Sequence, residues 1–411
     1  MKTFLHRDMI EAARLTQAGQ LGEATALIQS LLRSGVARDT AADHPARDRQ
    51  APTIELTAEN ITRGFQQRAR PTASNTDGRS NRGRQFSRPS LRSTLSHLER
   101  LRTMMRQGEG VATHSFRPPP PLPDGARFVS AKFSGAAGSR DYKLYIPSGY
   151  RNEPVPLIVM LHGCTQSAED FATGTGMKAL AEKNGLLVLY PVQAQSANSS
   201  RCWNWFKPTD QRRDAGEPSL IAGMTKKVAR EMAVDARRIY VAGLSAGGAA
   251  AAIMATAYPD LFAAVGVHSG LPFGAASDLP SALSAMLQGS VAMHKPTATQ
   301  RIPAIVFHGD QDKIVHPHNG VQIIRQFQPT ERADLRAVTV KGQADGGLSY
   351  SRTCHLDSAE RALLEKWTIH GSGHAWSGGN AGGTYTDPRG PDASREMVRF
   401  FLQHSHPLSK E

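Results

Sequence analysis

The chain has 411 residues, enough for one large domain or two ordinary ones with a sizeable buried core. It contains no run of about 18 consecutive apolar residues, so the sequence predicts no membrane-spanning helix. The formal net charge of +13 favours contact with anionic partners, and its position along the chain decides which segment makes that contact.

Residues 1–34 predict an amphipathic helix or a helical hairpin. Apolar side chains recur at helical spacing between residues 8 and 34, and Gly19 interrupts them. The opening stretch MKTFLHRDMIEAARLTQAG carries charged side chains in every turn and lacks the apolar centre of a secretory signal. We therefore expect a cytoplasmic protein whose three cysteines are reduced, although one disulfide stays possible.

Residues 35–124 predict a basic, proline-rich and largely disordered linker. Residues 1–130 hold 20 Lys and Arg against 12 Asp and Glu, so most of the net charge lies in this part of the chain. The stretch RPTASNTDGRSNRGRQFSRPS has no helical or strand period, and RPPPPLPDG is typical of a stiff spacer. Two interpretations stay open, a solvated spacer or an arm that binds an anionic surface; we expect no specific nucleic acid partner.

Residues 125–408 predict an α/β domain. Helical patterns cover 216–233, 246–257 and 394–404. Continuous apolar strands that alternate with helices indicate a mostly parallel sheet covered on both faces. The first two strands have no helix between them, so we expect an antiparallel hairpin at the sheet edge. The predicted strands are 128–133, 142–147, 156–162, 185–191, 238–243, 262–270, 303–309, 336–340 and 366–371.

The segment RIYVAGLSAGGAA places Ser245 between a predicted strand and a predicted helix, with Gly243 and Gly247 on either side. In a strand–turn–helix context this pattern exposes the serine hydroxyl on a sharp turn, where it can act as a nucleophile. The following helix directs N–H groups toward developing negative charge. Ser245 is therefore the candidate nucleophile; the alternative is a small packing residue at a helix start.

A serine nucleophile needs a histidine base and a carboxylate, and both candidates follow in chain order. Asp310 and Asp312 come just after a predicted strand, and His370 and His374 follow another. We favour Asp312, which lies further into its loop, and His374, which lies in a glycine-rich loop. His308, His316 and His318 are interpreted as structural or exposed. The histidines have no metal-binding spacing, so we expect neither metal nor cofactor.

The segment PLIVMLHGCTQSAEDF predicts the loop that completes such a site. In this kind of fold one oxyanion N–H comes from the loop after that strand and the other from the residue after the nucleophile. We therefore expect the backbone N–H groups of Cys164 and Ala246 to stabilise the oxyanion. Cys164 as a nucleophile is the weaker alternative. The aromatic residues Trp203 and Trp205 could line a substrate groove or anchor their loop as buried side chains.

Five motifs resemble the polyhydroxybutyrate (PHB) depolymerase family of esterases: LHGCTQSAEDF, CWNWF with GEPSLIAGM, VAGLSAGGAAA, HGDQDKIVHP and GSGHAWSGG. The resemblance runs from about residue 126 to 404. It implies an α/β-hydrolase fold. It also implies that Ser245 is the nucleophile, Asp312 the acid, His374 the base and Cys164 the oxyanion residue.

The resemblance predicts a serine carboxylic-ester hydrolase that acts through an acyl-enzyme on short hydroxyacyl esters or polyhydroxybutyrate. Family members also include feruloyl and acetylxylan esterases, which are the alternative. A third hypothesis is a granule- or membrane-surface binding protein that uses the hydrolase domain as a scaffold. Many relatives are extracellular, whereas this sequence predicts a cytoplasmic, granule-associated protein because it shows no signal-like segment.

Overall fold

The computed structural model describes residues 121–290, 302–328 and 335–407. The predicted N-terminal helix (1–34) and all but the last four residues of the predicted linker (35–124) lie outside these ranges. None of the helices within the described ranges is both long and apolar enough to cross a membrane.

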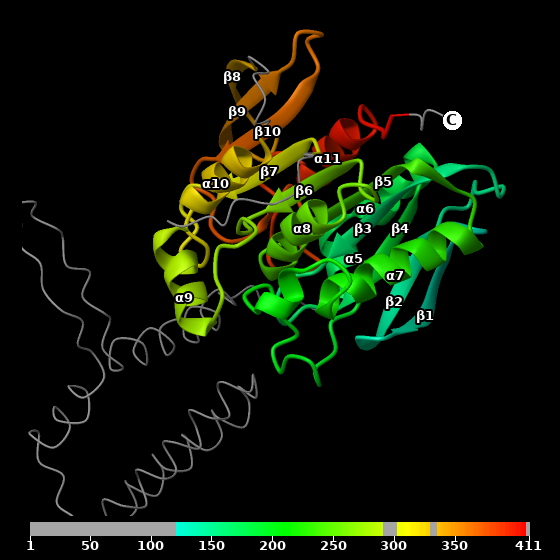
Figure 1. Cartoon of the computed structure of the whole chain (residues 1–411). Coiled ribbons are helices and arrows are strands. Elements are labelled where there is room, and N and C mark those ends of the chain that lie inside the picture. Colours follow the sequence, from blue (N-terminus) through cyan, green and yellow to red (C-terminus); the bar gives the residue numbers. More distant parts are fainter. Residues whose placement is uncertain (1–120, 291–301, 329–334, 408–411) are drawn as a thin grey trace, which may run out of the picture. The chain divides into compact units, whose positions relative to one another are not determined.

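A ten-stranded sheet organises the described residues (Figure 1), in the order β1-β2-β4-β3-β5-β6-β7-β10-β9-β8. Its strands are β1 (Arg127–Gly135), β2 (Gly138–Ile146), β3 (Val155–Leu161), β4 (Leu187–Pro191), β5 (Val234–Leu244), β6 (Ala264–His268), β7 (Ala304–Gly309), β8 (Arg336–Gln343), β9 (Ser349–Leu356) and β10 (Ala362–Ile369). A separate parallel pair joins β11 (Trp376–Ser377) to β12 (Thr386–Asp387).

The helices cover both faces of the sheet, as the sequence predicts. Side chains of α7, α8, α9 and α10 belong to one apolar core, and side chains of α5, α6 and α11 belong to the other. The helices are α5 (Ala168–Thr175), α6 (Met177–Asn184), α7 (Gly216–Glu231), α8 (Ala246–Ala257), α9 (Leu279–Gln288), α10 (His318–Phe327) and α11 (Ala393–Phe401), with a short 3₁₀ helix η1 (Pro208–Gln211).

The expected antiparallel hairpin is confirmed: β1 pairs with β2 at one edge of the sheet, coloured cyan in Figure 1. The other edge differs from the prediction. There β9 follows β8 and pairs antiparallel with both β8 and β10. The sequence SYSRTCHL of β9 carries no continuous apolar run, because this extension of the sheet has no fully buried face.

The central strands position the site. The six strands β4, β3, β5, β6, β7 and β10 pair in parallel, so their carboxyl ends meet at one edge. In open sheets of this kind ligands bind beyond the carboxyl ends of the strands. The segments that follow β3, β5, β7 and β10 carry Cys164, Ser245, Asp312 and His374 respectively.

Candidate active site

Ser245 occupies a strained turn between β5 and α8. Its backbone angles are φ 57° and ψ −120°, which an L-residue rarely adopts. The flanking glycines make the turn possible. A Cβ on Gly243 would lie 2.3 Å from the carbonyl oxygen of Gly247, and one on Gly247 would lie 2.0 Å from that of Leu161. The predicted strand–turn–helix context of Ser245 is therefore present, and this serine is partly exposed.

Asp312 and His374 form a hydrogen-bonded pair at the carboxyl ends of β7 and β10. Asp312 Oδ2 lies 2.7 Å from His374 Nδ1, and its Oδ1 accepts the N–H groups of Ile314 and Val315, both at 2.9 Å. The Asp312 side chain is 0% exposed and the His374 side chain 10%. Burial raises the pKa of the Asp312 carboxyl, but the neighbouring His374 and His308 imidazoles outweigh burial and hold that pKa well below its usual range.

Asp310 and His370, the candidates not favoured from the sequence, form a second pair. Asp310 Oδ2 lies 2.9 Å from His370 Nδ1, and His370 Nε2 lies 2.8 Å from Ser351 Oγ. The His370 and Asp310 side chains are 40% and 34% exposed, so water reaches both. Ser351 lies within β9, between β8 and β10, and not at a turn from a strand into a helix. Each aspartate therefore has its own histidine, and only the buried pair is shielded from solvent.

His268 relates Ser245 to the buried pair. The backbone N–H of Ser245 donates to the carbonyl of His268 at 2.9 Å. Burial, together with the nearby His308 and His374, lowers the pKa of the His268 imidazole to about 3. The backbone of Ser245 is thus bonded to a residue whose imidazole lies close enough to Asp312 and His374 for their charges to shift its pKa.

The loop after β3 runs beside Ser245. A Cβ on Gly163 would lie 3.7 Å from the Cβ of Ser245. The N–H groups of Gly163 and Thr165 are engaged, with Gln166 Oε1 at 2.9 Å and Ser200 O at 2.7 Å. Within the described part of the chain no acceptor takes the N–H of Cys164. Ala246 is the first residue of α8, where a backbone N–H has no intrahelical partner. Both N–H groups are available to an oxyanion.

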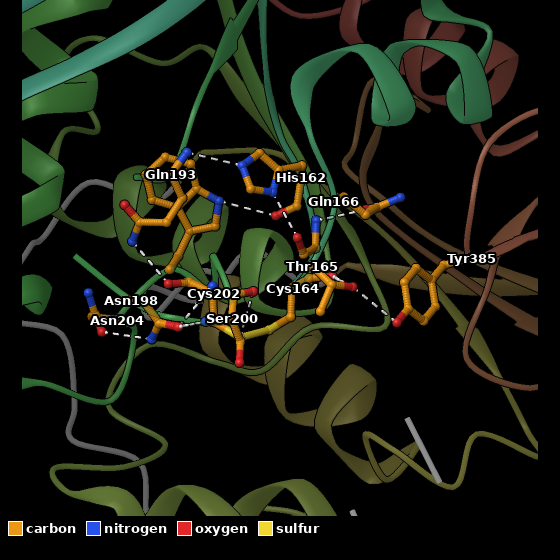
Figure 2. The surroundings of a disulfide bond; sticks show 12 residues. His162, Cys164, Thr165, Gln166, Gln193, Asn198, Ser200, Cys202, Asn204 and Tyr385 are labelled. Atoms are coloured by element: carbon orange, nitrogen blue, oxygen red, sulfur yellow. Dashed lines mark hydrogen bonds between the residues drawn. A yellow bond between two sulfur atoms is a disulfide. The ribbon is translucent and has the colours of Figure 1, made fainter. Parts of the chain in front are cut away.

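A disulfide joins Cys164 to Cys202 (Figure 2). The expectation that all three cysteines are reduced is therefore wrong for these two, while Cys354 is a free, partly buried thiol. Their 38-residue separation gives no hint of the pairing, which arises because the segments after β3 and β4 meet. The disulfide also rules out Cys164 as a free thiolate nucleophile.

Trp203 and Trp205 anchor their loop. They are only 1% and 6% exposed and belong to the apolar core beside α7 and α8. Trp203 Nε1 donates to the carbonyl of His162 at 3.1 Å, and its ring packs against the His162 imidazole. The assignment of these two tryptophans to substrate binding is therefore corrected, because buried side chains cannot line an open groove.

The sequence does not predict two contacts near the site. His308 is buried, and its Nε2 lies 3.4 Å from Asp312 Oδ2 and 2.8 Å from the carbonyl of Val315. It is structural, as the sequence suggests, but it supports the buried carboxylate directly. At the rim, Tyr385 Oη lies 3.2 Å from Thr165 Oγ1, beside the disulfide in Figure 2. Nothing in the spacing of these residues along the chain predicts that they meet.

Comparisons with known proteins agree with this architecture. Residues 140–338 match the family model described as esterase PHB depolymerase. Poly(3-hydroxyalkanoate) depolymerase C of Paucimonas lemoignei is 31% identical over 271 residues, covering 63% of this chain and 62% of that protein. Feruloyl esterase B of Neurospora crassa is 31% identical over 200 residues, covering 44% of this chain and 67% of that protein.

A solved structure shares the fold. The acetyl xylan esterase from Aspergillus awamori superimposes with a TM-score of 0.53 at 19% identity, covering 67% of this chain and 99% of that one. Among the curated relatives, the chain spans 62%, 56% and 50% of the length of a poly(3-hydroxyalkanoate) depolymerase, an acetylxylan esterase and a poly(3-hydroxybutyrate) depolymerase. The family match, these relatives and the α/β-hydrolase architecture together show that the chain belongs to the PHB depolymerase family of esterases.

Proposed function

We propose that this protein is a serine carboxylic-ester hydrolase in which Ser245 is the nucleophile, His374 the general base and Asp312 the acid that orients it. The observation that carries the proposal is the buried Asp312–His374 pair, 2.7 Å apart, at the sheet edge where Ser245 occupies its strained turn. Asp312 bonds to Nδ1, so a neutral His374 keeps its proton on Nδ1 and Nε2 is free to accept a proton.

The reaction follows from these roles. Ser245 Oγ attacks the ester carbonyl while its proton moves to His374 Nε2, and the tetrahedral intermediate expels the alcohol, which takes that proton. The acyl group is now on Ser245. Water then attacks the carbonyl of the acyl-enzyme and gives its proton to His374 Nε2. The second tetrahedral intermediate expels Ser245 Oγ, which takes that proton back, and the carboxylic acid is released.

The negative oxygen of the intermediate is assigned to the backbone N–H groups of Cys164 and Ala246. Both are donors without an acceptor of their own in the described residues, and the segment at residues 162–164 runs beside Ser245. Donors fixed in place before the reaction stabilise the charge only as it develops, which lowers the barrier rather than tightening ground-state binding.

For the substrate we propose a short hydroxyacyl ester or polyhydroxybutyrate, because two of the curated relatives are depolymerases of such polyesters. Feruloyl and acetyl groups on plant polysaccharide are the second candidate, favoured by the feruloyl and acetylxylan esterases among the relatives. A protein that binds a granule or membrane surface with an inactive hydrolase scaffold is the third candidate. The buried Asp312–His374 pair and the strained turn at Ser245 argue against it.

A substrate panel separates the three candidates. The rates of hydrolysis of p-nitrophenyl butyrate, methyl ferulate, acetylated xylan and amorphous polyhydroxybutyrate are compared, with Ser245→Ala as the blank. We expect p-nitrophenyl butyrate and the polyester to be hydrolysed fastest. Preference for methyl ferulate or acetylated xylan would reassign the substrate. No turnover of any ester by a folded protein would refute the enzymatic proposal.

A further inference from the structure

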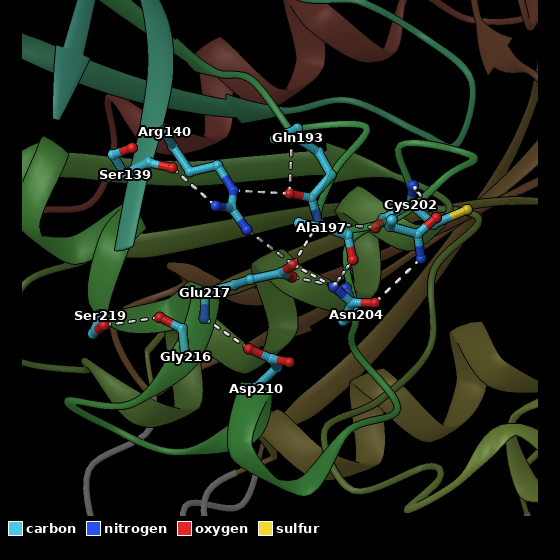
Figure 3. A network of polar contacts seen from close by, with 12 residues as sticks. Ser139, Arg140, Gln193, Ala197, Cys202, Asn204, Asp210, Gly216, Glu217 and Ser219 are labelled. Carbon is cyan, nitrogen blue, oxygen red and sulfur yellow. Dashed lines mark hydrogen bonds and ion pairs between the residues drawn. The ribbon is translucent and has the colours of Figure 1, made fainter. Parts of the chain in front are cut away.

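Glu217 is a buried carboxylate on α7 with no role in the proposed chemistry (Figure 3). Three N–H groups donate to it. The backbone N–H of Asn204 lies 2.7 Å from Oε2, Asn204 Nδ2 lies 2.6 Å from Oε1, and Gln193 Nε2 also donates to Oε1. Arg140 Nη2 is 3.9 Å away, and Arg140 Nε donates to Gln193 Oε1 at 3.0 Å. Since amide N–H groups only donate, the ionised carboxylate is the form of Glu217 that accepts all three of them.

The residues held by Glu217 continue to the oxyanion loop. Gln193 donates its backbone N–H to His162 Nε2 at 3.1 Å. The other ring nitrogen of His162, Nδ1, lies 2.7 Å from the carbonyl oxygen of Gly163. Because Nε2 accepts, Nδ1 carries the proton and donates to that carbonyl. The carbonyl of Gly163 and the N–H of Cys164 belong to one planar peptide unit, so His162 orients the N–H assigned to the oxyanion.

A second connection runs through the disulfide. Gln193 Nε2 donates to the carbonyl of Cys202 at 2.9 Å, and Cys202 is bonded to Cys164 (Figures 2 and 3). Asn204, which Glu217 holds at two points, lies two residues further along the same loop. The Gly163–Cys164 peptide is therefore held in two ways: through the carbonyl of Gly163 and through the disulfide-bonded side chain of Cys164. Both connections begin at Glu217.

We propose that Glu217 is a positioning residue for ester hydrolysis: through Gln193, His162 and the Cys164–Cys202 disulfide, it holds the Gly163–Cys164 peptide so that its N–H meets the oxyanion. This inference rests on the proposed function, since it requires Cys164 to be an oxyanion donor. Glu217 itself is buried, so we assign it an action through these residues and no contact with the ester.

We call the chain of contacts from Glu217 through Gln193 and His162 to the Gly163–Cys164 peptide the relay. It depends on the charge of Glu217. Burial, together with Asp210 from η1, raises the pKa of its carboxyl to about 7, although the hydrogen bonds from Gln193 and Asn204 act in the opposite direction. Arg140 from β2 is the cation that faces it, and the segment at residues 193–204 contributes only amides. The carboxylate form, which accepts all three N–H groups, is present above about pH 7 and is lost as the pH falls. The relay should therefore loosen on the acid side of neutrality.

The test compares Glu217→Gln with Glu365→Gln. Glu365 is a control because it is also a buried glutamate, held between Arg352 and Arg399 on β10, several strands from the oxyanion loop after β3. Hydrolysis of p-nitrophenyl butyrate is measured per active site, counted by the end point of fluorophosphonate labelling. We expect Glu217→Gln to lower kcat roughly 10- to 100-fold, because loss of a whole oxyanion donor costs about 10²–10³, with KM within about threefold. Glu365→Gln should change kcat less than about twofold.

Two further measurements keep the test decisive if Glu217→Gln folds poorly. Gln193→Met cuts the relay at its next member and should lower kcat in the same way. The acid limb of the wild-type kcat profile should contain an ionisation near pH 7 that Glu217→Gln and Gln193→Met lack. An unchanged kcat in both variants, an equal loss in Glu365→Gln, or identical acid limbs would overturn the positioning role. A wild-type enzyme that is neither labelled nor active would instead refute the proposed function.

Discussion

Asp310 and Asp312 lie only two residues apart along the chain, yet their carboxylates have very different surroundings. Asp312 is buried against His374, His308 and two backbone N–H groups, whereas the partly exposed Asp310 bonds to His370 and to the N–H of Gly371. For a buried carboxylate these partners outweigh the cost of burial, so Asp312 stays ionised through the ordinary pH range. An ionised acid next to the base stabilises the imidazolium that forms during catalysis.

Asp312→Asn should therefore lower kcat by roughly 10⁴, the loss seen when a comparable triad loses its acid and the imidazole adopts the wrong tautomer. Asp310→Asn is the matched control and should keep kcat within about threefold, an allowance for surface substitutions away from the site. Steady-state hydrolysis of p-nitrophenyl butyrate measures both. A larger loss in Asp310→Asn would assign the acid to the exposed pair.

At the scale of single residues, the sequence points to the proposed nucleophile more clearly than to its proposed partners. The glycines around Ser245 have a mechanical reason that can be read from the spacing. The choice between the two aspartates and between the two histidines depends on which side chains are buried together, and chain order carries no information on that. The same limit explains the cysteines: Cys164 and Cys202 meet because two loops converge, and the tryptophans beside Cys202 are buried for the same reason.

The turn at Ser245 between β5 and α8, which we call the elbow, requires its backbone and that of Leu161 to approach closely. Gly247→Ala should destabilise the fold by about 1–3 kcal/mol, the usual cost of overpacking, because its new Cβ would lie 2.0 Å from the carbonyl of Leu161. Gly149→Ala is the control, since its Cβ would meet no atom within 4 Å. Chemical denaturation compares the free energies of unfolding. Equal stability of the two variants would mean that the elbow tolerates a side chain.

The disulfide ties the segment after β3 to the segment after β4. Removing a disulfide typically costs about 2–4 kcal/mol, largely by freeing the unfolded chain. Cys164→Ala and Cys202→Ala delete the same bond, so both should lose a similar free energy of unfolding, while Cys354→Ala should change it little. Denaturation without reductant tests this. If only one of the two variants were destabilised, its side chain would matter for packing and the bond itself would contribute little.

At the scale of elements, the alternation of apolar strands and helices predicts the central sheet and the bounds of α8. It also predicts the antiparallel hairpin of β1 and β2. Strand β9 escapes prediction because its sequence SYSRTCHL has no continuous apolar run, and it pairs only with β8 and β10 at the edge of the sheet. A strand of that kind is fixed by its neighbours in the fold rather than by its own hydrophobic pattern.

For the whole molecule, composition separates the N-terminal part from the hydrolase domain. Residues 61–106 hold 11 arginines and two acidic residues with few large apolar side chains. Charge of this kind acts over roughly 8 Å at physiological salt, so it suits attachment to an anionic or granule surface better than shaping a catalytic pocket. We propose that this segment tethers the enzyme to a particulate substrate.

A chain that begins at Pro118 tests the tether. It should keep kcat/KM for p-nitrophenyl butyrate within about threefold of the full chain, because the site residues all lie downstream. It should lose salt-sensitive co-sedimentation with polyhydroxybutyrate granules and with anionic vesicles. Binding that persists after truncation would make the segment a spacer. Loss of small-ester activity in a folded protein would make it part of the site.

The central claim is that Ser245 is the nucleophile of an ester hydrolase, and covalent labelling tests it most directly. The wild-type protein is treated with a fluorophosphonate, digested and mapped by mass spectrometry, and Ser245→Ala is assayed in parallel. We predict one labelled peptide, with the label on Ser245, and a loss of kcat on the order of 10⁶ in the variant, the typical cost of removing a triad nucleophile. A label on Ser351 or another serine, or turnover that survives Ser245→Ala, would contradict the account.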